Sequence, residues 1–388
     1  WQVISKPFIY SLLAGIFLGA YLLTWMGALL FVFIITVYFI IQFISDYLRG
    51  RSTAYLCLVG TTLFFIALIT SLTNPILRGL FYLIPLIVAL FIPLVLSGVS
   101  RLMIANKQPA VYYPLSLIGL GLAGVGIFYL INPYLIRVML AAFKVFTPTG
   151  AQLTTIEMQP ILFPTGQFTL ALVWGNFSTA LFLSLVCLGY LVYLVIKHGD
   201  SEKSLLAVWS LIILVATLGQ RRFGYYFAVN VAVLTGYLVW SVIKLVVTQK
   251  QRSSANYPAI ILILLFTGHL ILIGVAMGFR NFALYLVINL VLLAAYLGWR
   301  TLQFGISRKA TPAKAKIVQA GYIGLTGLVI FFNAFFPNIP GAITTASQAR
   351  YAPSDAWQSS LLWLKENTPD PFGNANYYYE IPKLPPPG

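Results

Sequence analysis

The sequence predicts an all-α polytopic membrane protein with about eleven transmembrane helices, and three observations support this prediction. The 388 residues are 60% hydrophobic and only 8% charged, with a mean hydropathy of +0.90. Soluble domains carry about 25% charged residues. Apolar runs recur along the chain, each long enough to cross a hydrocarbon core of about 30 Å. Lys and Arg fall in the short segments between these runs, which is typical of topology signals.

The predicted spans follow one another from the first residues to position 336. They cover residues 8–23, 27–44, 54–72, 80–96, 111–132, 168–196, 204–219, 224–247, 258–276, 281–299 and 317–336. Residues 1–336 are therefore predicted to form a transmembrane domain, which one long external loop interrupts at 133–167. Loops of that length between membrane helices often carry function.

The basic residues of successive loops predict the orientation of the chain. Loops on one side hold the larger and more densely spaced set: Arg49, Arg51, Arg101, Lys107, Lys197, Lys203, Lys244, Lys250, Arg252, Arg300, Arg308, Lys309, Lys314 and Lys316. We expect this side to face the cytoplasm, so that the loop 133–167, the turn 219–223 and the C-terminal tail share the outer face. The net charge of +16 is spread over these loops rather than gathered in one patch, which argues against a nucleic-acid partner.

The C-terminal part of the chain has a different composition. Residues 337–388 are predicted to be an external linker and the start of a truncated soluble C-terminal domain. Within them, APSDAWQSSLLWLKENTPDP predicts an amphipathic helix that begins at Ser354 or Asp355 and ends at Asn367. Its apolar stripe consists of Trp357, Leu361 and Leu364. The chain does not begin with Met and it stops in the proline run LPPPG, so we expect a piece of a longer protein.

Glu157, within the stretch AQLTTIEMQP, is the only acidic residue between Asp46 and Asp200. The flanking sequence MQPILFPTG is apolar and proline-containing, which indicates a segment that lies on or dips into the membrane surface. A solvated loop acid is the alternative interpretation. A lone carboxylate binds a divalent ion only weakly, so a metal site here would need ligands from elsewhere.

Two adjacent arginines, Arg221 and Arg222, stand between hydrophobic spans in the stretch GQRRFGYYFAVN. Such a pair is unusual on the outer face of a membrane. One interpretation is snorkelling of both side chains to lipid phosphates. The other is a guanidinium placed to hold a phosphate or pyrophosphate, because its planar donors bind such groups in a bidentate fashion.

These stretches together resemble the catalytic subunit of oligosaccharyltransferase of the archaeal type, a polytopic C-type glycosyltransferase. The stretch from Thr154 to Glu157 has the form of the family's Ser/Thr-x-x-Glu motif. The stretch QRRFGYYFAV (220–229) resembles the family's arginine-phenylalanine helix start, in which Arg222 is the residue before Phe223. Three further stretches fit the same pattern: TWMGALLF (24–31), VWGNF (173–177) and SLLWLKENTPDPFGNANYYYE (360–380).

The resemblance implies protein N-glycosylation, in which an oligosaccharide moves from a polyprenyl phosphate or pyrophosphate carrier to the asparagine amide of an Asn-x-Ser/Thr sequence in an acceptor polypeptide. It implies a Mg²⁺ or Mn²⁺ ion with Glu157 as one ligand, and a place for Thr154 in substrate binding. Arg222 would stabilise negative charge on the departing phosphate, with Arg221 as the alternative bearer of that role. The active site would face the cell exterior, or the lumen of the endoplasmic reticulum in a eukaryote.

The sequence also departs from the family pattern. The family's other acidic metal ligands would lie upstream of Trp1, and its Trp-Trp-Asp motif, which grips the Ser or Thr of the acceptor sequence, would lie past Gly388. More spans follow Arg222 than the pattern leads one to expect.

Two other functions remain open at this point. One is a different polytopic C-type glycosyltransferase that uses a lipid-phosphate sugar donor. The other is a transporter of lipid-linked sugars, for which polar residues or broken helices at mid-membrane depth are expected. The scarcity of charged residues within the spans counts against the transporter.

Overall fold

The structure is a computed structural model that describes residues 2–143, 146–148, 153–164, 166–248, 338–348 and 355–367, together with single positions between 320 and 336. The predicted spans 258–276 and 281–299, and most of 317–336, lie outside the described residues. The chain divides into two compact units, Trp1–Asn338 and Ile339–Gly388.

Eight described helices are long and apolar enough to cross a membrane. They are α1 (Gln2–Thr24), α2 (Leu29–Leu48), α3 (Ala54–Ser71), α4 (Leu80–Ala105), α5 (Tyr112–Ile131), α8 (Ala180–His198), α9 (Ser201–Gly219) and α10 (Gly224–Thr248). They coincide in order with the first eight predicted spans, which confirms the polytopic helical architecture for this part of the chain. A helix satisfies its backbone polar groups internally, which lipid demands of any spanning segment. The total of eleven spans stays a prediction.

Shorter elements connect these helices or follow them. They are the 3₁₀ helices η1 (Met26–Ala28), η2 (Pro75–Arg78), η5 (Ile156–Met158) and η6 (Arg221–Phe223), and the helices α6 (Pro133–Ala142), α7 (Ala171–Phe177), α14 (Asn338–Gln348) and α15 (Asp355–Asn367). The helix predicted in the tail is therefore present as α15, which begins at Asp355 and ends at Asn367.

Two stretches differ from the sequence-based prediction. The span predicted at 168–196 is too long at its N-terminal end, because the chain forms the short helix α7, then a break, and only then the membrane-length helix α8. Ser178 has a positive φ of 48° at this break, a backbone conformation that no α-helix can contain. Hydropathy does not reveal the break, since both pieces are apolar. The predicted loop 133–167 also begins with α6, whose first turn Asn132 caps by accepting a hydrogen bond from the Tyr134 amide at 2.9 Å.

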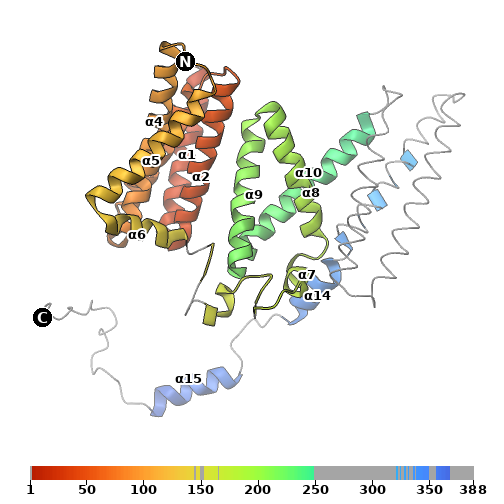
Figure 1. Ribbon diagram of the computed structural model, residues 1–388. Helices are drawn as coiled ribbons and strands as arrows, with labels where there is room; N and C mark the ends of the chain where they lie inside the picture. Colours follow the sequence, from red (N-terminus) through yellow and green to blue (C-terminus); the bar gives the residue numbers. More distant parts are fainter. Residues whose placement is uncertain are drawn as a thin grey trace, which may run out of the picture. The chain divides into compact units, whose positions relative to one another are not determined.

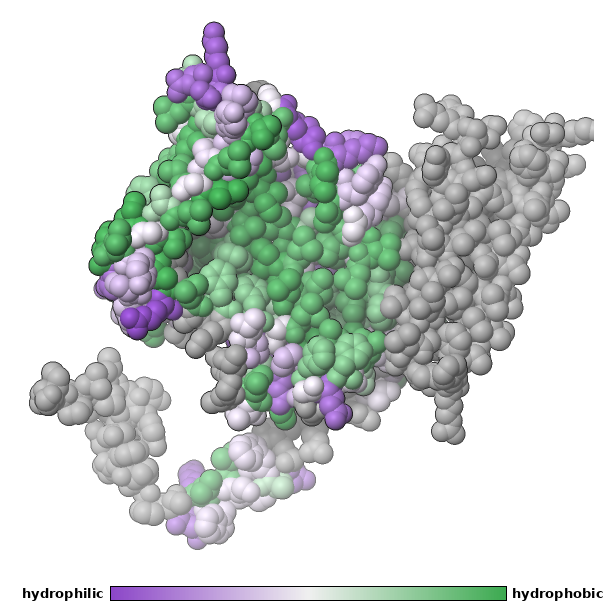
Figure 2. Space-filling model, in the orientation of Figure 1, coloured by the Kyte–Doolittle hydropathy of each residue, from purple (hydrophilic) through white to green (hydrophobic). Residues whose placement is uncertain are grey.

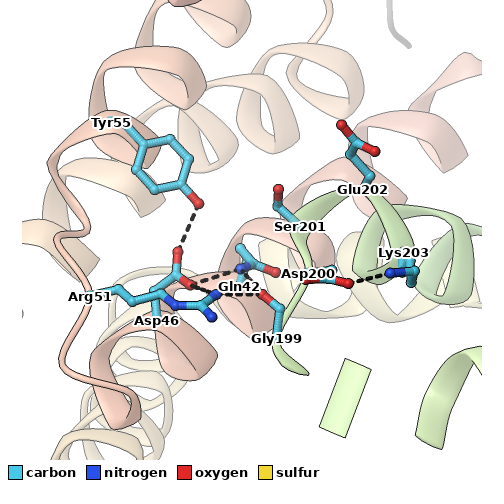
Figure 3. Close-up of a pocket in the computed structure, with 9 residues that line it drawn as sticks. All are labelled: Gln42, Asp46, Arg51, Tyr55, Gly199, Asp200, Ser201, Glu202 and Lys203. Carbon is cyan, nitrogen blue, oxygen red and sulfur yellow. Dashed lines mark hydrogen bonds and ion pairs between the residues drawn. The ribbon is translucent and has the colours of Figure 1, made fainter. Parts of the chain in front are cut away.

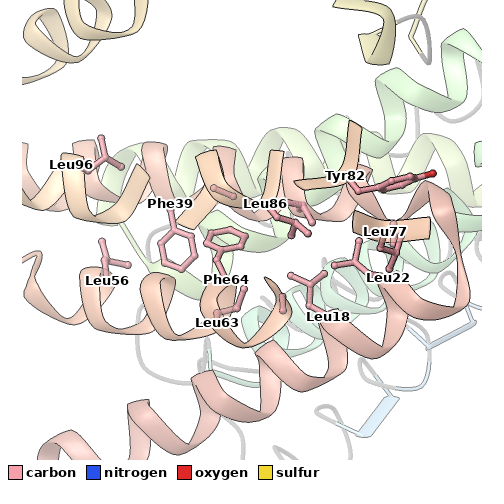
Figure 4. Packing of buried hydrophobic residues seen from close by; sticks show 14 of the residues in the cluster. Leu18, Leu22, Phe39, Leu56, Leu63, Phe64, Leu77, Tyr82, Leu86 and Leu96 are labelled. Carbon is pink, nitrogen blue, oxygen red and sulfur yellow. The ribbon is translucent and has the colours of Figure 1, made fainter. Parts of the chain in front are cut away.

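Within the first unit, α1, α3, α4 and α2 pack as one group of helices, and α8, α9 and α10 pack as another (Figure 1). α2 and α9 are in contact and join the two groups. Figure 4 shows the buried core of the first group, with the rings of Phe39 and Phe64 between α2 and α3 and Leu86 of α4 beside them. Figure 2 shows hydrophobic side chains along the visible helices and hydrophilic ones near their ends, as expected for helices surrounded by lipid.

Among the described helices, α1 and α3 approach each other closely. A Cβ added to Gly15 would lie 2.7 Å from the Leu63 carbonyl oxygen, and one added to Gly19 would lie 2.5 Å from Cβ of Thr70. The two glycines are four residues apart and so share one face of α1. Small residues at this spacing let helix backbones approach closely, which is a common way to associate helices in membranes.

A buried carboxylate organises the end of α2. Asp46 is 1% exposed. It accepts hydrogen bonds from Gln42 Nε2 at 3.0 Å and from the Tyr55 hydroxyl at 2.7 Å, and Arg51 lies 3.8 Å away as its ion-pair partner. Figure 3 shows these side chains around a hollow of about 400 Å³, opposite the N-terminus of α9. A buried charge is tolerated when it is paired and hydrogen-bonded in this way.

Two arginines then connect this end of α2 to the C-terminus of α8. Arg51 donates to the carbonyls of His198 and Gly199, each at 3.0 Å. Arg49 donates to the carbonyls of residues 195–197. The last carbonyls of a helix lack partners within it, and the helix dipole favours cations there. We call this set of contacts, made by Asp46, Arg49 and Arg51, the clasp.

Candidate functional site

The segments that the sequence singled out meet at one end of the described helices, the end opposite the clasp. α9 ends at Gly219, η6 carries Arg221 and Arg222, and α10 begins at Gly224. Neighbouring helices run antiparallel in Figure 1, so the junction between α1 and α2 lies at this same end.

The external loop contacts η6 directly. Glu157 lies in η5 and is exposed, as is Thr154 three residues before it. η5 is in contact with η6, and the Arg221 amide donates a hydrogen bond of 3.0 Å to the Gln159 carbonyl. The sequence predicted that the loop and the arginine turn share one side of the membrane. The structure brings the Glu157 turn and the arginine turn together as neighbours.

A second part of the same loop rests on the end of α9. A Cβ added to Gly219 would overlap the carbonyl group of Phe146, so only glycine allows this approach. The Phe146 ring lies 6.4 Å from the Phe33 ring of α2, and Phe143 meets Phe33 edge-on at 5.6 Å. The loop is therefore held by α2 and by the α9–α10 turn.

Arg222 is the half-buried cation of this site. Its guanidinium carbon lies 5.1 Å from the centre of the Phe223 ring. Its Nε is buried and has no hydrogen-bond partner among the residues that the structure describes. A buried donor left unsatisfied costs about 1–3 kcal/mol. Within the described residues, no ion pair joins Arg222 or Arg221 to Glu157. A cation with a buried, unsatisfied donor is suited to bind an oxyanion.

Aromatic side chains support the start of α10 beneath the arginines. The Tyr226 ring stacks on Trp25 with centroids 5.2 Å apart and meets Phe31 at 6.0 Å. Phe223 also contacts Tyr226, at 6.2 Å. The stretch TWMGALLF, which contains Trp25 and Phe31, thus packs beside the arginine turn. Such stacked rings define the position of the η6 turn because they restrict how α10 begins.

Sequence reasoning did not find Gln159, Gly219 or Phe146. Their importance comes from contacts between segments that are distant in the chain, and a glutamine or a glycine in a loop carries no local signal for such a contact. The stretch MQPILFPTG offered one hint, since its apolar residues indicated a segment that packs against the bundle or the membrane.

The described residues do not make a metal site by themselves. They contain no group of three His, Cys, Asp or Glu side chains that could hold an ion. Glu157 alone offers carboxylate oxygens at the arginine turn, whereas Mg²⁺ takes about six ligands. A metal ion bound at Glu157 would need ligands besides this carboxylate.

Comparisons with known proteins agree on one group of relatives. No protein-family model matches the chain. The chain is 24% identical over 97% of its length to dolichyl-phosphooligosaccharide-protein glycotransferase 3 of Archaeoglobus fulgidus. Its fold matches the crystal structure of the Archaeoglobus fulgidus oligosaccharyltransferase in the apo form with a TM-score of 0.69, at 23% identity and over 98% of this chain. The chain is similar to archaeal oligosaccharyltransferases in sequence and in fold. This finding confirms the resemblance that the sequence suggested.

Two further matches extend the comparison. The chain is 27% identical, over 61% of its length, to the dolichyl-monophosphooligosaccharide–protein glycotransferase AglB of Haloferax volcanii. It matches the Archaeoglobus fulgidus AglB solved in complex with an inhibitory peptide and a dolichol-phosphate with a TM-score of 0.65, at 22% identity and over 94% of this chain.

The homologous oligosaccharyltransferases are much longer than this chain. The chain spans 38% of the Archaeoglobus fulgidus glycotransferase and 30% of the Haloferax volcanii protein. The eight helices of this chain that could span a bilayer are consistent with an integral membrane protein.

Proposed function

We propose that the protein transfers an oligosaccharide from a polyprenyl phosphate or pyrophosphate carrier to the asparagine amide of Asn-x-Ser/Thr sequences. One observation of the site supports this best: the half-buried Arg222, with an unsatisfied Nε, lies in a turn that contacts the loop bearing the exposed Glu157. The homologues are named glycotransferases, and one was solved with an inhibitory peptide and a dolichol-phosphate.

In this proposal, Arg222 binds the phosphate of the lipid carrier. Cleavage of the bond between sugar and phosphate leaves negative charge on the phosphate, and a guanidinium placed beforehand stabilises that charge as it develops. The guanidinium carbon of Arg222 lies 5.1 Å from the centre of the Phe223 ring, and the planar donors of a guanidinium match the oxygens of a phosphate. Arg221 lies next to it and can supply a second cation.

Glu157 acts on the acceptor in the same proposal. The amide nitrogen of asparagine is a poor nucleophile because its lone pair is conjugated with the carbonyl group. A carboxylate that accepts a hydrogen bond from the amide orients it and weakens that conjugation. Thr154, exposed on the same turn, is proposed to contribute to substrate binding.

We also propose that activity depends on Mg²⁺ or Mn²⁺ and that Glu157 is one of its ligands. The remaining ligands would come from residues outside the described part of the chain. A transfer assay with and without a chelator tests this directly.

The test of the proposed function is a transfer assay on membranes that contain the intact protein. A fluorescent peptide with an Asn-x-Thr sequence is incubated with lipid extract and Mn²⁺, and a mobility shift on a gel reports glycosylation. We expect wild type to shift the peptide, EDTA to abolish the shift and added Mn²⁺ to restore it. Glu157→Gln should lower the rate about 10²-fold or more, because an interaction formed in the transition state is lost.

Glu202→Gln serves as the matched control, since Glu202 is an exposed acid at the opposite end of α9. It should keep the wild-type rate. If wild type does not shift the peptide although the lipid donor is present, the proposed function is wrong. Transfer to lipid or to Ser/Thr hydroxyls by the same membranes would then favour another C-type glycosyltransferase.

A further inference from the structure

Gln159 lies at the boundary between a buried and an exposed part of the external loop. Two residues after it, Ile161 is 1% exposed and packs among Phe177, Phe227 and Ile34, which come from α7, α10 and α2. Before it, residues 153–157 are all exposed. The loop is therefore anchored on the C-terminal side of Gln159, and the turn that bears Glu157 extends beyond that anchor.

The backbone carbonyl and the side-chain amide of Gln159 each form a hydrogen bond. Its carbonyl accepts the Arg221 amide at 3.0 Å, which ties the loop to η6. Its side-chain Nε2 donates to the Leu153 carbonyl at 3.0 Å, which closes residues 153–159 into a compact turn. The Met158 amide donates to the Thr155 carbonyl at 2.9 Å inside this turn. One residue thus joins the turn around Glu157 to the arginine turn.

The backbone of Gln159 is fixed independently of its side chain. Pro160 follows it, and a residue before proline is confined to extended conformations. Gln159 has φ −72° and ψ 146°, which is the polyproline II conformation. A substitution at 159 should therefore preserve the carbonyl bond to Arg221 and remove only the side-chain bond to Leu153.

We propose that Gln159 is a positioning residue, which holds the turn carrying Glu157 beside the Arg222 turn through these two bonds. This inference rests on the proposed function, because the purpose of the arrangement is to present Glu157 to the acceptor at the place where Arg222 binds the donor phosphate. Gln159 itself touches no reacting group in this account.

Amide hydrogen exchange tests the structural half of the inference without any substrate. Exchange is measured by mass spectrometry on the intact protein in nanodiscs, over residues 153–158 and at Arg221. Gln159→Ala should speed exchange of the Met158 amide about three- to tenfold, as expected when one hydrogen bond that closes the turn is lost. Gln159→Glu has the same size but cannot donate at neutral pH, and it should behave in the same way.

The catalytic half is tested by steady-state transfer kinetics on the same variants. Both should lower kcat about three- to tenfold while KM for the lipid donor stays unchanged, because the Arg222 turn is intact. Gln167→Ala, at an exposed glutamine of the same loop, should match wild type in exchange and in transfer.

The outcomes separate this inference from the proposed function. Unchanged exchange over 153–158 in both variants overturns the inference, whatever happens to transfer. Faster exchange with wild-type kcat also overturns it, because Glu157 then needs no such support. If wild type transfers nothing, the proposed function fails, and the exchange data alone decide whether Gln159 holds the turn.

Discussion

At the scale of single residues, the surroundings of Arg222 suit the directed donors of a guanidinium rather than a positive charge alone. Its guanidinium carbon lies 5.1 Å from the centre of the Phe223 ring, and within the described part of the chain its buried Nε has no hydrogen-bond partner. Lysine carries the same charge but has no Nε donor and no planar group to stack on a ring. A site that needs charge alone would accept either residue, whereas a site that needs directed donors would not.

We therefore predict that Arg222→Lys lowers the transfer rate about 10- to 100-fold, the expected loss for one hydrogen bond to a charged group. Arg222→Ala should lower it about 10²- to 10³-fold, because a whole preorganised charge is removed. The measurement is the initial rate of peptide glycosylation at saturating lipid donor.

Arg101→Lys is the matched control, at an exposed arginine of α4 far along the chain from the site. It should leave the rate unchanged. An Arg222→Lys variant as active as wild type would show that charge suffices and that the directed donors of the guanidinium contribute nothing.

At the scale of elements, the contact between α1 and α3 depends on glycine. Gly15 and Gly19 allow the α1 backbone to approach α3 so closely that even a methyl group at either position would overlap its neighbours. α5 offers the contrast, because four of its glycines have no atom within 4 Å of an added Cβ: Gly119, Gly121, Gly124 and Gly126.

We predict that Gly19→Leu destabilises the folded protein by about 1–3 kcal/mol or more, the usual cost of overpacking a filled contact. The thermal midpoint of unfolding in detergent should fall accordingly. Gly121→Leu adds the same side chain where space is open and should leave the midpoint nearly unchanged. Equal midpoints for the two variants would contradict the packing described for α1 and α3.

The helices also show which features of the fold the sequence could predict and which it could not. Hydropathy alone located all eight described spans, because lipid requires a long apolar helix and tolerates little else. It missed the break at Ser178, because a backbone torsion leaves no trace in hydropathy. Sequence motifs selected Glu157 and Arg222 as candidates, but not Gln159 or Gly219. Those two residues matter through contacts that only the folded chain creates.

At the scale of the whole molecule, the two ends of the helices have different chemistry. The clasp with Arg49 and Arg51 lies at one end, and the arginine turn with the Glu157 loop lies at the other. The density of basic residues in short loops favours the cytoplasm for the clasp end. The proposed function requires the opposite end to face the exterior.

Cysteine labelling in intact cells tests this orientation. In a background in which Cys57 and Cys187 are replaced by alanine, Gln167→Cys should react with a membrane-impermeant maleimide. Gln108→Cys, exposed between α4 and α5, should react only after the membrane is permeabilised. The reverse pattern would place the candidate site in the cytoplasm and contradict the proposed orientation.

The clasp also has a consequence for the order of events during synthesis. Arg49 and Arg51 bond to carbonyls that lie 146 to 148 residues later in the chain. At about 5–20 residues per second, the ribosome needs about 7–30 s to supply those partners. During that interval the carbonyls that the two arginines bind do not yet exist, so this joint between α2 and α8 forms only after α8 has been made.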